Sequence, residues 1–497
     1  MKLLKHLLSD TLVYGISSVI ARFINYLLVP FHTGLFNPEA YGIVGLVYAA
    51  IGLLQVFFTF GMESSYLRYG KDREQAASIF STIQRALLAG GLFFIFVLWL
   101  FQVPLSDLLS LPAASSSTKH IYWLMMGILL VDALAIVPFA ELRLSKRAYS
   151  FAWLKLGHVI INISLNGYLI LVLHWGIEAI FMANLLASLA ALLGVFGLTA
   201  RLWRGAWSSD LLRKMVQFGW PFVPAGLAHV VNETLDRFFL KSLTGEQIYA
   251  IYGMDLSADH IVGVYNACYK LAVFMLLLVQ MYRMAWQPFF MRYSDDSDAP
   301  SLFGMAFKYF NIAAALVFLA VGLFVESIVA IPIPFLNTTL INEAYWSGLS
   351  IVPWLLLAYW FQGWYINFSV GIFIQEKTKR LVQITGLGAI ITIIANIALI
   401  PVLGMKGAAI TTALSYGTMA VILFRTAQKA MKIPFGLIRA FGTIAVASSA
   451  VWGAQSIQVW IDLSKDLAGF LILVLAMLVI IPLQIVNVDT KPAKISS

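Results

Sequence analysis

Residues 309–333 read YFNIAAALVFLAVGLFVESIVAIPI, and Glu326 is the only charged side chain in this stretch. A helix of this length crosses the roughly 30 Å of hydrocarbon in a bilayer. The sequence predicts a polytopic, all-α membrane protein, because comparable stretches recur along the whole chain. We place about 14 transmembrane helices at residues 9–31, 40–62, 79–101, 120–141, 150–173, 176–200, 212–236, 261–287, 309–333, 348–374, 381–402, 406–426, 437–460 and 466–487.

The overall composition excludes a soluble protein. Hydrophobic residues make up 61% of the 497 positions and charged residues 11%, against roughly 25% charged in soluble domains. The mean hydropathy is +0.86. The single cysteine, Cys268, permits no intrachain disulfide. We find no metal-ligand spacing, phosphate-binding loop or catalytic nucleophile pattern, so we expect no metal, no cofactor and no enzyme activity.

The lysines and arginines predict the orientation in the membrane. In the loops between the predicted spans, 23 of them lie on the side of the N-terminus and 5 on the opposite side. Cytoplasmic loops carry such an excess, so both termini are expected in the cytoplasm. The net charge of +9 is explained by this asymmetry, and no nucleic-acid partner is expected. The basic N-terminus and the stretch 9–31 lack a cleavage site, which indicates an uncleaved first span.

Two distant segments share a pattern that predicts an internal repeat. Asn166–Ile180 reads NGYLILVLHWGIEAI and Asn396–Ile410 reads NIALIPVLGMKGAAI. Each has an asparagine, an apolar run, a glycine turn and Ala-Ile, and each follows a loop with a Lys-Arg pair. Because six predicted spans separate the copies, the two halves have the same orientation, which is typical of one group of transporter folds. Chance similarity between apolar strings is the alternative.

The repeat predicts two parallel six-helix bundles followed by two further helices. We expect an N-terminal bundle at residues 1–205 and a second bundle at 206–432. Residues 433–497 then hold the last two spans and a short cytoplasmic tail.

Polar side chains within the predicted spans are the candidate site residues. Charges and amides are costly in hydrocarbon and are expected to face a cavity or a partner. Three sets have the three- and four-residue spacing that places side chains on one face of a helix: Ser18, Arg22 and Asn25; His158, Asn162 and Asn166; and His229, Asn232, Glu233 and Asp236. Asp132, Lys270 and Arg283 belong to none of these sets. Lys270 and Arg283 are 13 positions apart, about 140° around a helix, so both cannot point straight into one cavity. The alternatives are ion pairs, such as Glu233 with Arg237, and snorkelling to the interface.

Several strings together resemble the multidrug/oligosaccharidyl-lipid/polysaccharide exporter superfamily, in its polysaccharide (O-antigen) flippase branch. The likeness extends over essentially the whole chain. It is carried by YLLVPFHTGLFNPEAYGIVGL (Tyr26–Leu46), FGMESSYLRYG (Phe60–Gly70), LRLSKRAYSFA (Leu142–Ala152), FGWPFVPAGLAHVVNETLDRFFL (Phe218–Leu240), VGVYNACYKLA (Val262–Ala272) and AWQPFF (Ala285–Phe290).

The resemblance implies a flippase of the cytoplasmic membrane that serves cell-surface polysaccharide biosynthesis by alternating access. Its cargo would be an oligosaccharide on polyprenyl pyrophosphate, and its partners membrane lipids and polysaccharide-assembly proteins. A pyrophosphate needs cationic donors, so the substrate-binding residues expected are Arg22, Asn25, Asn166, Lys270 and Arg283. Ion coupling is a hypothesis for Asp132, Glu233 and Asp236.

Four alternatives remain open from the sequence. They are a lipid II flippase, a drug/cation antiporter of the same superfamily, a polysaccharide polymerase or ligase, and an uncoupled lipid scramblase. An antiporter of cations is expected to have an acidic lumen, whereas the mid-span charges here are more often basic. A polymerase or ligase is expected to need a large outer loop, and the predicted loops are short.

Overall fold

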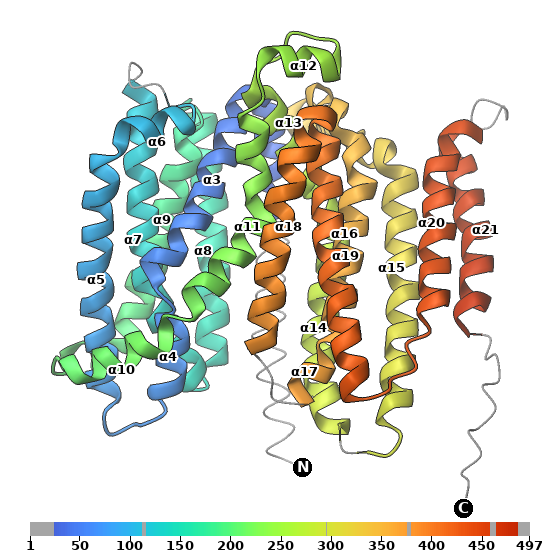
Figure 1. Ribbon diagram of the computed structural model, residues 1–497. Helices are drawn as coiled ribbons and strands as arrows, with labels where there is room; N and C mark the ends of the chain where they lie inside the picture. Colours follow the sequence, from blue (N-terminus) through green and yellow to red (C-terminus); the bar gives the residue numbers. More distant parts are fainter. Residues whose placement is uncertain (1–23, 112–115, 295, 375–378, 458–463, 486–497) are drawn as a thin grey trace, which may run out of the picture. The chain divides into compact units, whose positions relative to one another are not determined.

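The chain folds almost wholly into helices. The computed structural model describes residues 24–111, 116–294, 296–374, 379–457 and 464–485 (Figure 1). Within these ranges the only sheet is an antiparallel pair of two-residue strands, β1 (Pro332–Ile333) and β2 (Thr338–Thr339). Eleven helical segments of the described chain are long and apolar enough to cross a membrane. They coincide with eleven of the predicted spans, so the protein is a polytopic all-α membrane protein.

Of the remaining three predicted spans, one stays a prediction and two differ from the structure. The span at 9–31 lies mostly outside the described residues. The expected span at 212–236 is wrong as one helix, because the structure has α10 (Ser209–Gly219) and α11 (Phe222–Lys241) in its place. Pro221 lacks an N–H and sits at this break.

The expected span at 348–374 is also divided. It comprises a 3₁₀ helix η5 (Glu343–Ile351), α16 (Val352–Phe368) and α17 (Val370–Ile374). Pro353 lies in the first turn of α16, where its missing N–H costs no hydrogen bond.

The described residues form two compact units. Unit 1 comprises residues 1–270, 332–348 and 385–412, and unit 2 comprises 271–331, 349–384 and 413–497. These boundaries differ from the expected ones after residues 205 and 432, and the twin six-helix division stays a prediction.

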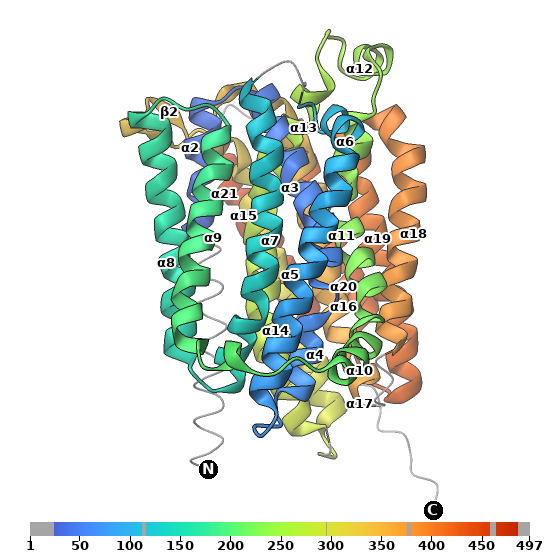
Figure 2. The same cartoon turned by 90° about the vertical axis from the view of Figure 1, so that its left-hand side faces the viewer.

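Unit 1 contains a bundle of long helices that includes α3, α5, α7, α8, α9 and α11, which run side by side (Figures 1 and 2). The short α10 lies across one end of this bundle beside α4, and α12 lies at the opposite end. Besides α10 and α11, unit 1 contains these helices: α2 (Leu28–Leu35), α3 (Pro38–Thr59), α4 (Met62–Tyr69), α5 (Ala76–Leu100), α6 (Gln102–Leu108), α7 (Ser116–Leu144), α8 (Ala148–Gly167), η1 (Tyr168–Val172), α9 (Glu178–Thr199), η2 (Leu202–Arg204), α12 (Gly245–Tyr252), α13 (Ala258–Tyr269) and η4 (Pro334–Leu336).

Unit 2 is held by a buried polar junction among aromatic side chains. The Asn311 side chain is fully buried. Its oxygen accepts hydrogen bonds from the indole N–H groups of Trp360 (2.9 Å) and Trp364 (2.8 Å), and its amide donates to the Phe307 carbonyl (2.8 Å). The helices of unit 2 are α14 (Val273–Tyr293), α15 (Ala299–Val329), α16, α17, α20 (Leu437–Ile457) and α21 (Lys465–Ile485), with the remaining parts of α18 (Lys379–Leu403) and α19 (Met405–Ala430).

The two segments of the predicted repeat have the same local form. Each is a helical hairpin whose turn contains one left-handed residue, His174 (φ 53°) after α8 and Gly404 (φ 55°) between α18 and α19. The two turn residues are equivalent in the sequence pattern that also equates Asn166 with Asn396. Both asparagines are fully buried. The backbone therefore supports the equivalence of these hairpins.

The tip of the α18–α19 hairpin is tied to α12. The backbone N–H of Met405 donates a hydrogen bond of 2.9 Å to the hydroxyl of Tyr252, the last residue of α12. Burial raises the pKa of the Tyr252 phenol above its ordinary value. A Cβ at Gly404 would lie 2.1 Å from the Tyr252 hydroxyl, so both the contact and the left-handed φ require glycine there.

Candidate functional site

The site begins at a close crossing of α3 and α13. A Cβ at Gly263 would lie 1.8 Å from the carbonyl oxygen of Pro38, and a Cβ at Gly42 would lie 2.0 Å from that of Asp259. Small residues let helix backbones meet at such distances. The crossing packs α13 closely against the first turns of α3.

A polar cavity of about 370 Å³ lies in unit 1 beside this crossing. It is surrounded by residues of α2, α3, α8, α9, α11 and α13. The side chains that line it include two cations and no carboxylate of the described chain. The polar ones are Asn25, His32, Tyr41, Tyr48, His158, Asn162, Asn166, Asn184, Thr234, Arg237, Asn266 and Lys270.

Lys270 supplies a cation without an anionic partner. It begins the 3₁₀ turn η3 (Lys270–Ala272) that follows α13, and its ammonium lies 5.7 Å from the centre of the Tyr26 ring. No carboxylate of the described residues forms an ion pair with it. A lone ammonium at membrane depth costs roughly 3 kcal/mol. An anion entering the cavity would offset that cost.

Arg237 is the second cation of the cavity, and sequence reasoning missed it. Its side chain is 7% exposed and its Nη1 lies 2.9 Å from the Asp236 carboxylate. The same nitrogen donates to the Glu233 carbonyl at 2.8 Å, and the guanidinium lies 4.7 Å from the centre of the Tyr269 ring. The predicted span ended at residue 236, which placed Arg237 in an outer loop. α11 in fact continues to Lys241.

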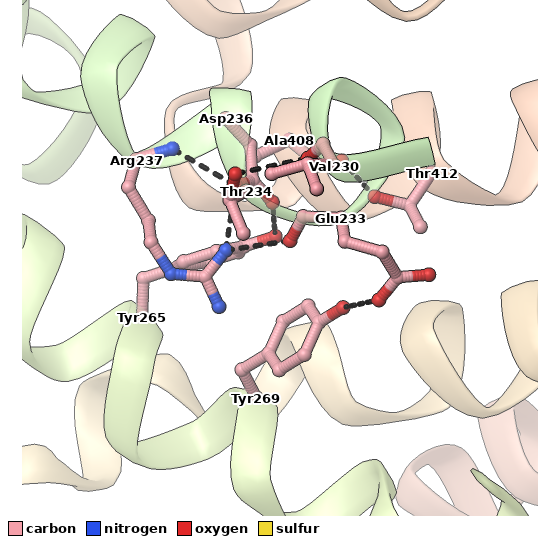
Figure 3. A network of polar contacts seen from close by, with 9 residues as sticks. All are labelled: Val230, Glu233, Thr234, Asp236, Arg237, Tyr265, Tyr269, Ala408 and Thr412. Atoms are coloured by element: carbon pink, nitrogen blue, oxygen red, sulfur yellow. Dashed lines mark hydrogen bonds and ion pairs between the residues drawn. The ribbon is translucent and has the colours of Figure 1, made fainter. Parts of the chain in front are cut away.

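The predicted coupling residues of α11 belong to the network around Arg237 (Figure 3). Asp236 accepts hydrogen bonds from the Arg237 backbone N–H (2.9 Å) and from the Tyr265 hydroxyl. Glu233 accepts one from the Tyr269 hydroxyl at 3.3 Å. Asp236 thus neutralises Arg237 in part and holds its guanidinium in place at the edge of the cavity.

The amide side chains of the cavity form a connected chain. His32 Nε2 lies 2.9 Å from Asn166 Oδ1. The Asn166 amide donates to the main-chain oxygen of Asn162 (2.9 Å) and to its Oδ1 (3.1 Å), and the Asn162 amide donates to Asn25 Oδ1 (3.4 Å). Asn266 also lines the cavity with 6% exposure. The predicted residues Asn25, Asn166 and Lys270 are therefore brought together.

A second cavity of about 420 Å³ meets the first at His158 and Asn184, which line both. The predicted coupling residue Asp132 lines it and hydrogen-bonds Ser188. His158 Nε2 lies 3.3 Å from the same hydroxyl. The other charged residues around it are Lys155, whose ammonium lies 4.3 Å from the centre of the Phe139 ring, and the ion pair of Glu63 with Arg143.

The predicted coupling residues Glu233 and Asp236 lie beside Arg237 and do not themselves line either cavity. Two predicted substrate-binding residues are also not among the lining residues. Arg22 lies outside the described residues. Arg283 belongs to unit 2, where it is exposed on α14. Within the described part of the chain, no group of three or more His, Cys, Asp or Glu is arranged to hold a metal ion.

Solved structures with the same fold are transporters of one superfamily. The lipid II flippase MurJ in an inward closed conformation matches with a TM-score of 0.69 at 15% identity, over 95% of this chain and 98% of that one. A multidrug resistance MATE family transporter of the MOP superfamily, in its inward-facing conformation, gives 0.62 at 16% identity over 84% and 94%. A MOP superfamily transporter from Pyrococcus furiosus, described as having a binding pocket of reverse polarity, gives 0.52 at 15% identity over 85% and 94%.

The fold is therefore that of a MOP superfamily transporter. Residues 7–294 match the model of a family described as polysaccharide biosynthesis protein. The chain belongs to this family. The search of curated proteins gives no match.

Proposed function

We propose that this protein moves an oligosaccharide linked to polyprenyl pyrophosphate from the inner to the outer leaflet of the cytoplasmic membrane, for cell-surface polysaccharide biosynthesis. One observation carries the proposal: Lys270 and Arg237 line a cavity whose lining includes no carboxylate of the described chain. No carboxylate of the described residues pairs with Lys270 there. Membership of the polysaccharide biosynthesis family supports a saccharide as the cargo.

The head of such a cargo matches the cavity in charge and in hydrogen bonding. A pyrophosphate is a multiply charged acceptor of hydrogen bonds, and lysine and arginine bind it with charge-assisted bonds. Amides such as Asn25 and Asn266 supply further donors. Asn166 hydrogen-bonds Asn162, which in turn donates to Asn25. The polyprenyl chain stays in the lipid, since moving this apolar chain from lipid into a polar cavity would give no favourable free energy.

Transport would proceed by alternating access between the two predicted repeats, with both termini in the cytoplasm. Arg22 and Arg283 are proposed to contact the head at other stages of the cycle. Coupling to an ion would use Asp132 in the second cavity, or Glu233 and Asp236 beside Arg237. If transport stays fully sensitive to uncouplers after Asp132, Glu233 and Asp236 are all neutralised, this coupling scheme is refuted.

The direct test is to identify the lipid that copurifies with the protein and to measure export by variants. We expect mass spectrometry to find a polyprenyl-linked saccharide. Lys270→Met should lower its retention and its export by at least about tenfold, the effect of one lost charge-assisted bond. Lys465→Met is the matched control, because Lys465 is exposed and paired with Glu326 at 2.8 Å.

The same experiment separates this proposal from the antiporter and from lipid II. Copurification of lipid II would assign that cargo instead. Tight binding of a cationic drug, unchanged in Lys270→Met, would contradict an anion-binding cavity and favour the antiporter.

A further inference from the structure

The hydrogen bonds that link His32 to Asn25 have a fixed direction. The main-chain oxygen of Asn162 is only an acceptor, and the side chain of Asn166 approaches it at 2.9 Å. The Asn166 group at this point must therefore be its amide nitrogen. The orientation of Asn166 is thus set by the backbone.

This orientation determines which atom of His32 carries a proton. With its nitrogen at Asn162, Asn166 turns its Oδ1 to His32 Nε2 at 2.9 Å. An amide oxygen has no hydrogen to donate, so His32 Nε2 must donate. His32 is 6% exposed and Asn166 is fully buried, so water cannot readily replace either partner in this hydrogen bond.

The same direction continues toward the cavity. Asn166 also donates to Asn162 Oδ1 (3.1 Å), which leaves the Asn162 amide nitrogen to donate to Asn25 Oδ1 (3.4 Å). Among the described residues, the Asn25 amide nitrogen is then the last group in this series of hydrogen bonds. Asn25 is exposed and lines the cavity that contains Lys270 and Arg237.

We infer that His32 is a positioning residue: by donating to Asn166 Oδ1 it holds the series of hydrogen bonds in the direction that the Asn162 main-chain oxygen requires, so that Asn25 presents N–H donors to the cavity that the two cations line. The inference rests on the proposed function and narrows its ligand: the cavity favours a group that only accepts hydrogen bonds, such as a fully deprotonated pyrophosphate. A cation, or a group that can only donate hydrogen bonds, would form no hydrogen bond with the Asn25 N–H donors. His32 itself would not touch the cargo.

The protonated nitrogen of His32 can be measured without any cargo. Solid-state NMR of the full-length protein in bilayers, with ¹⁵N-labelled histidine, distinguishes a protonated from an unprotonated Nε2. The His32→Gln variant identifies the signal of His32 by difference. We expect Nε2 of His32 to carry a proton. An unprotonated Nε2 would overturn the inference whatever the protein transports.

Binding of farnesyl pyrophosphate to the purified protein in nanodiscs tests the consequence. His32→Met removes the donor and should weaken binding about tenfold, whereas His32→Gln offers an amide donor and should stay within about twofold of the wild type. The control is His229→Met, since His229 is exposed on α11 and does not line the cavity. Equal affinities of the two His32 variants would overturn the inference.

A second variant guards against misfolding of His32→Met. Asn25 is exposed, and Asn25→Leu keeps the shape of the side chain without its donor. We expect about a tenfold loss of farnesyl pyrophosphate affinity, and unchanged affinity would contradict the role of the chain. If the wild type itself does not bind this probe, the proposed function fails, while the NMR result still decides which atom of His32 donates.

Discussion

The crossing of α3 and α13 predicts a large effect from the addition of one methyl group. In Gly263→Ala, the new Cβ would lie 1.8 Å from the Pro38 carbonyl oxygen and 3.0 Å from the Gly42 nitrogen. An ordinary contact of this kind needs about 3.3 Å. The two helices must therefore separate by roughly 1.5 Å, because backbone atoms cannot move aside as a side chain does.

The expected cost is at the upper end of the range for overpacking. Inserting a methyl group into a packed interior typically costs about 1–3 kcal/mol. Alanine recovers up to about 1 kcal/mol of helix propensity over glycine, which is too little to offset the loss of contact along the crossing. We expect a net destabilisation of about 2 kcal/mol and, for a chain of 497 residues, a melting temperature lower by about 2 °C.

The assay is thermal unfolding of the detergent-solubilised protein, followed by intrinsic fluorescence. Gly157→Ala on α8 is the matched control, since no atom lies within 4 Å of its Cβ position, and it should be neutral or slightly stabilising. Gly42→Ala should resemble Gly263→Ala, and the double variant should cost less than the sum, because one separation relieves both clashes. A Gly263→Ala protein that melts with the wild type would refute the reasoning.

Three further predictions concern other contacts. Asn311→Leu should destabilise the protein by about 3 kcal/mol, since two buried indole N–H groups lose their acceptor; a melting temperature equal to that of the wild type would contradict this. Lys465→Ala should change stability by less than about 0.5 kcal/mol, because the pair with Glu326 is exposed, and a clear loss in the same assay would be evidence against that view. Tyr252→Phe should increase hydrogen exchange at the Met405 amide, measured by mass spectrometry, and unchanged protection would show that the hydroxyl is dispensable.

Hydropathy predicted the membrane spans well where a span is one regular apolar helix. It failed at 212–236, where Pro221 separates α10 from α11. It also failed at 348–374, where the segment begins as a 3₁₀ helix and is interrupted at Ser369 between α16 and α17. The α11 helix continues past Asp236 with Arg237 and Lys241, since pairing with Asp236 and Asp259 keeps both cations within folded structure. A hydropathy window has no means of detecting such pairs.

The candidate site was predicted in part. Asn25, Asn166 and Lys270 were predicted because they are polar residues within predicted spans, and they line one cavity. Arg237 was missed through a span boundary that was five residues short. His32 was missed because it follows the predicted end of the first span by one residue, and only the three-dimensional contact with Asn166 makes it part of the site.

The bond between Tyr252 and Met405 offers a way to follow motion in this protein. Because the hairpin tip is hydrogen-bonded to α12, a label on α12 or its flank would report a displacement that keeps or breaks this contact. Met254 is 53% exposed just beyond the end of α12. The only natural cysteine, Cys268, is fully buried. A single substitution, Met254→Cys, therefore provides a selective attachment point for a spin label or fluorophore in an otherwise unaltered chain.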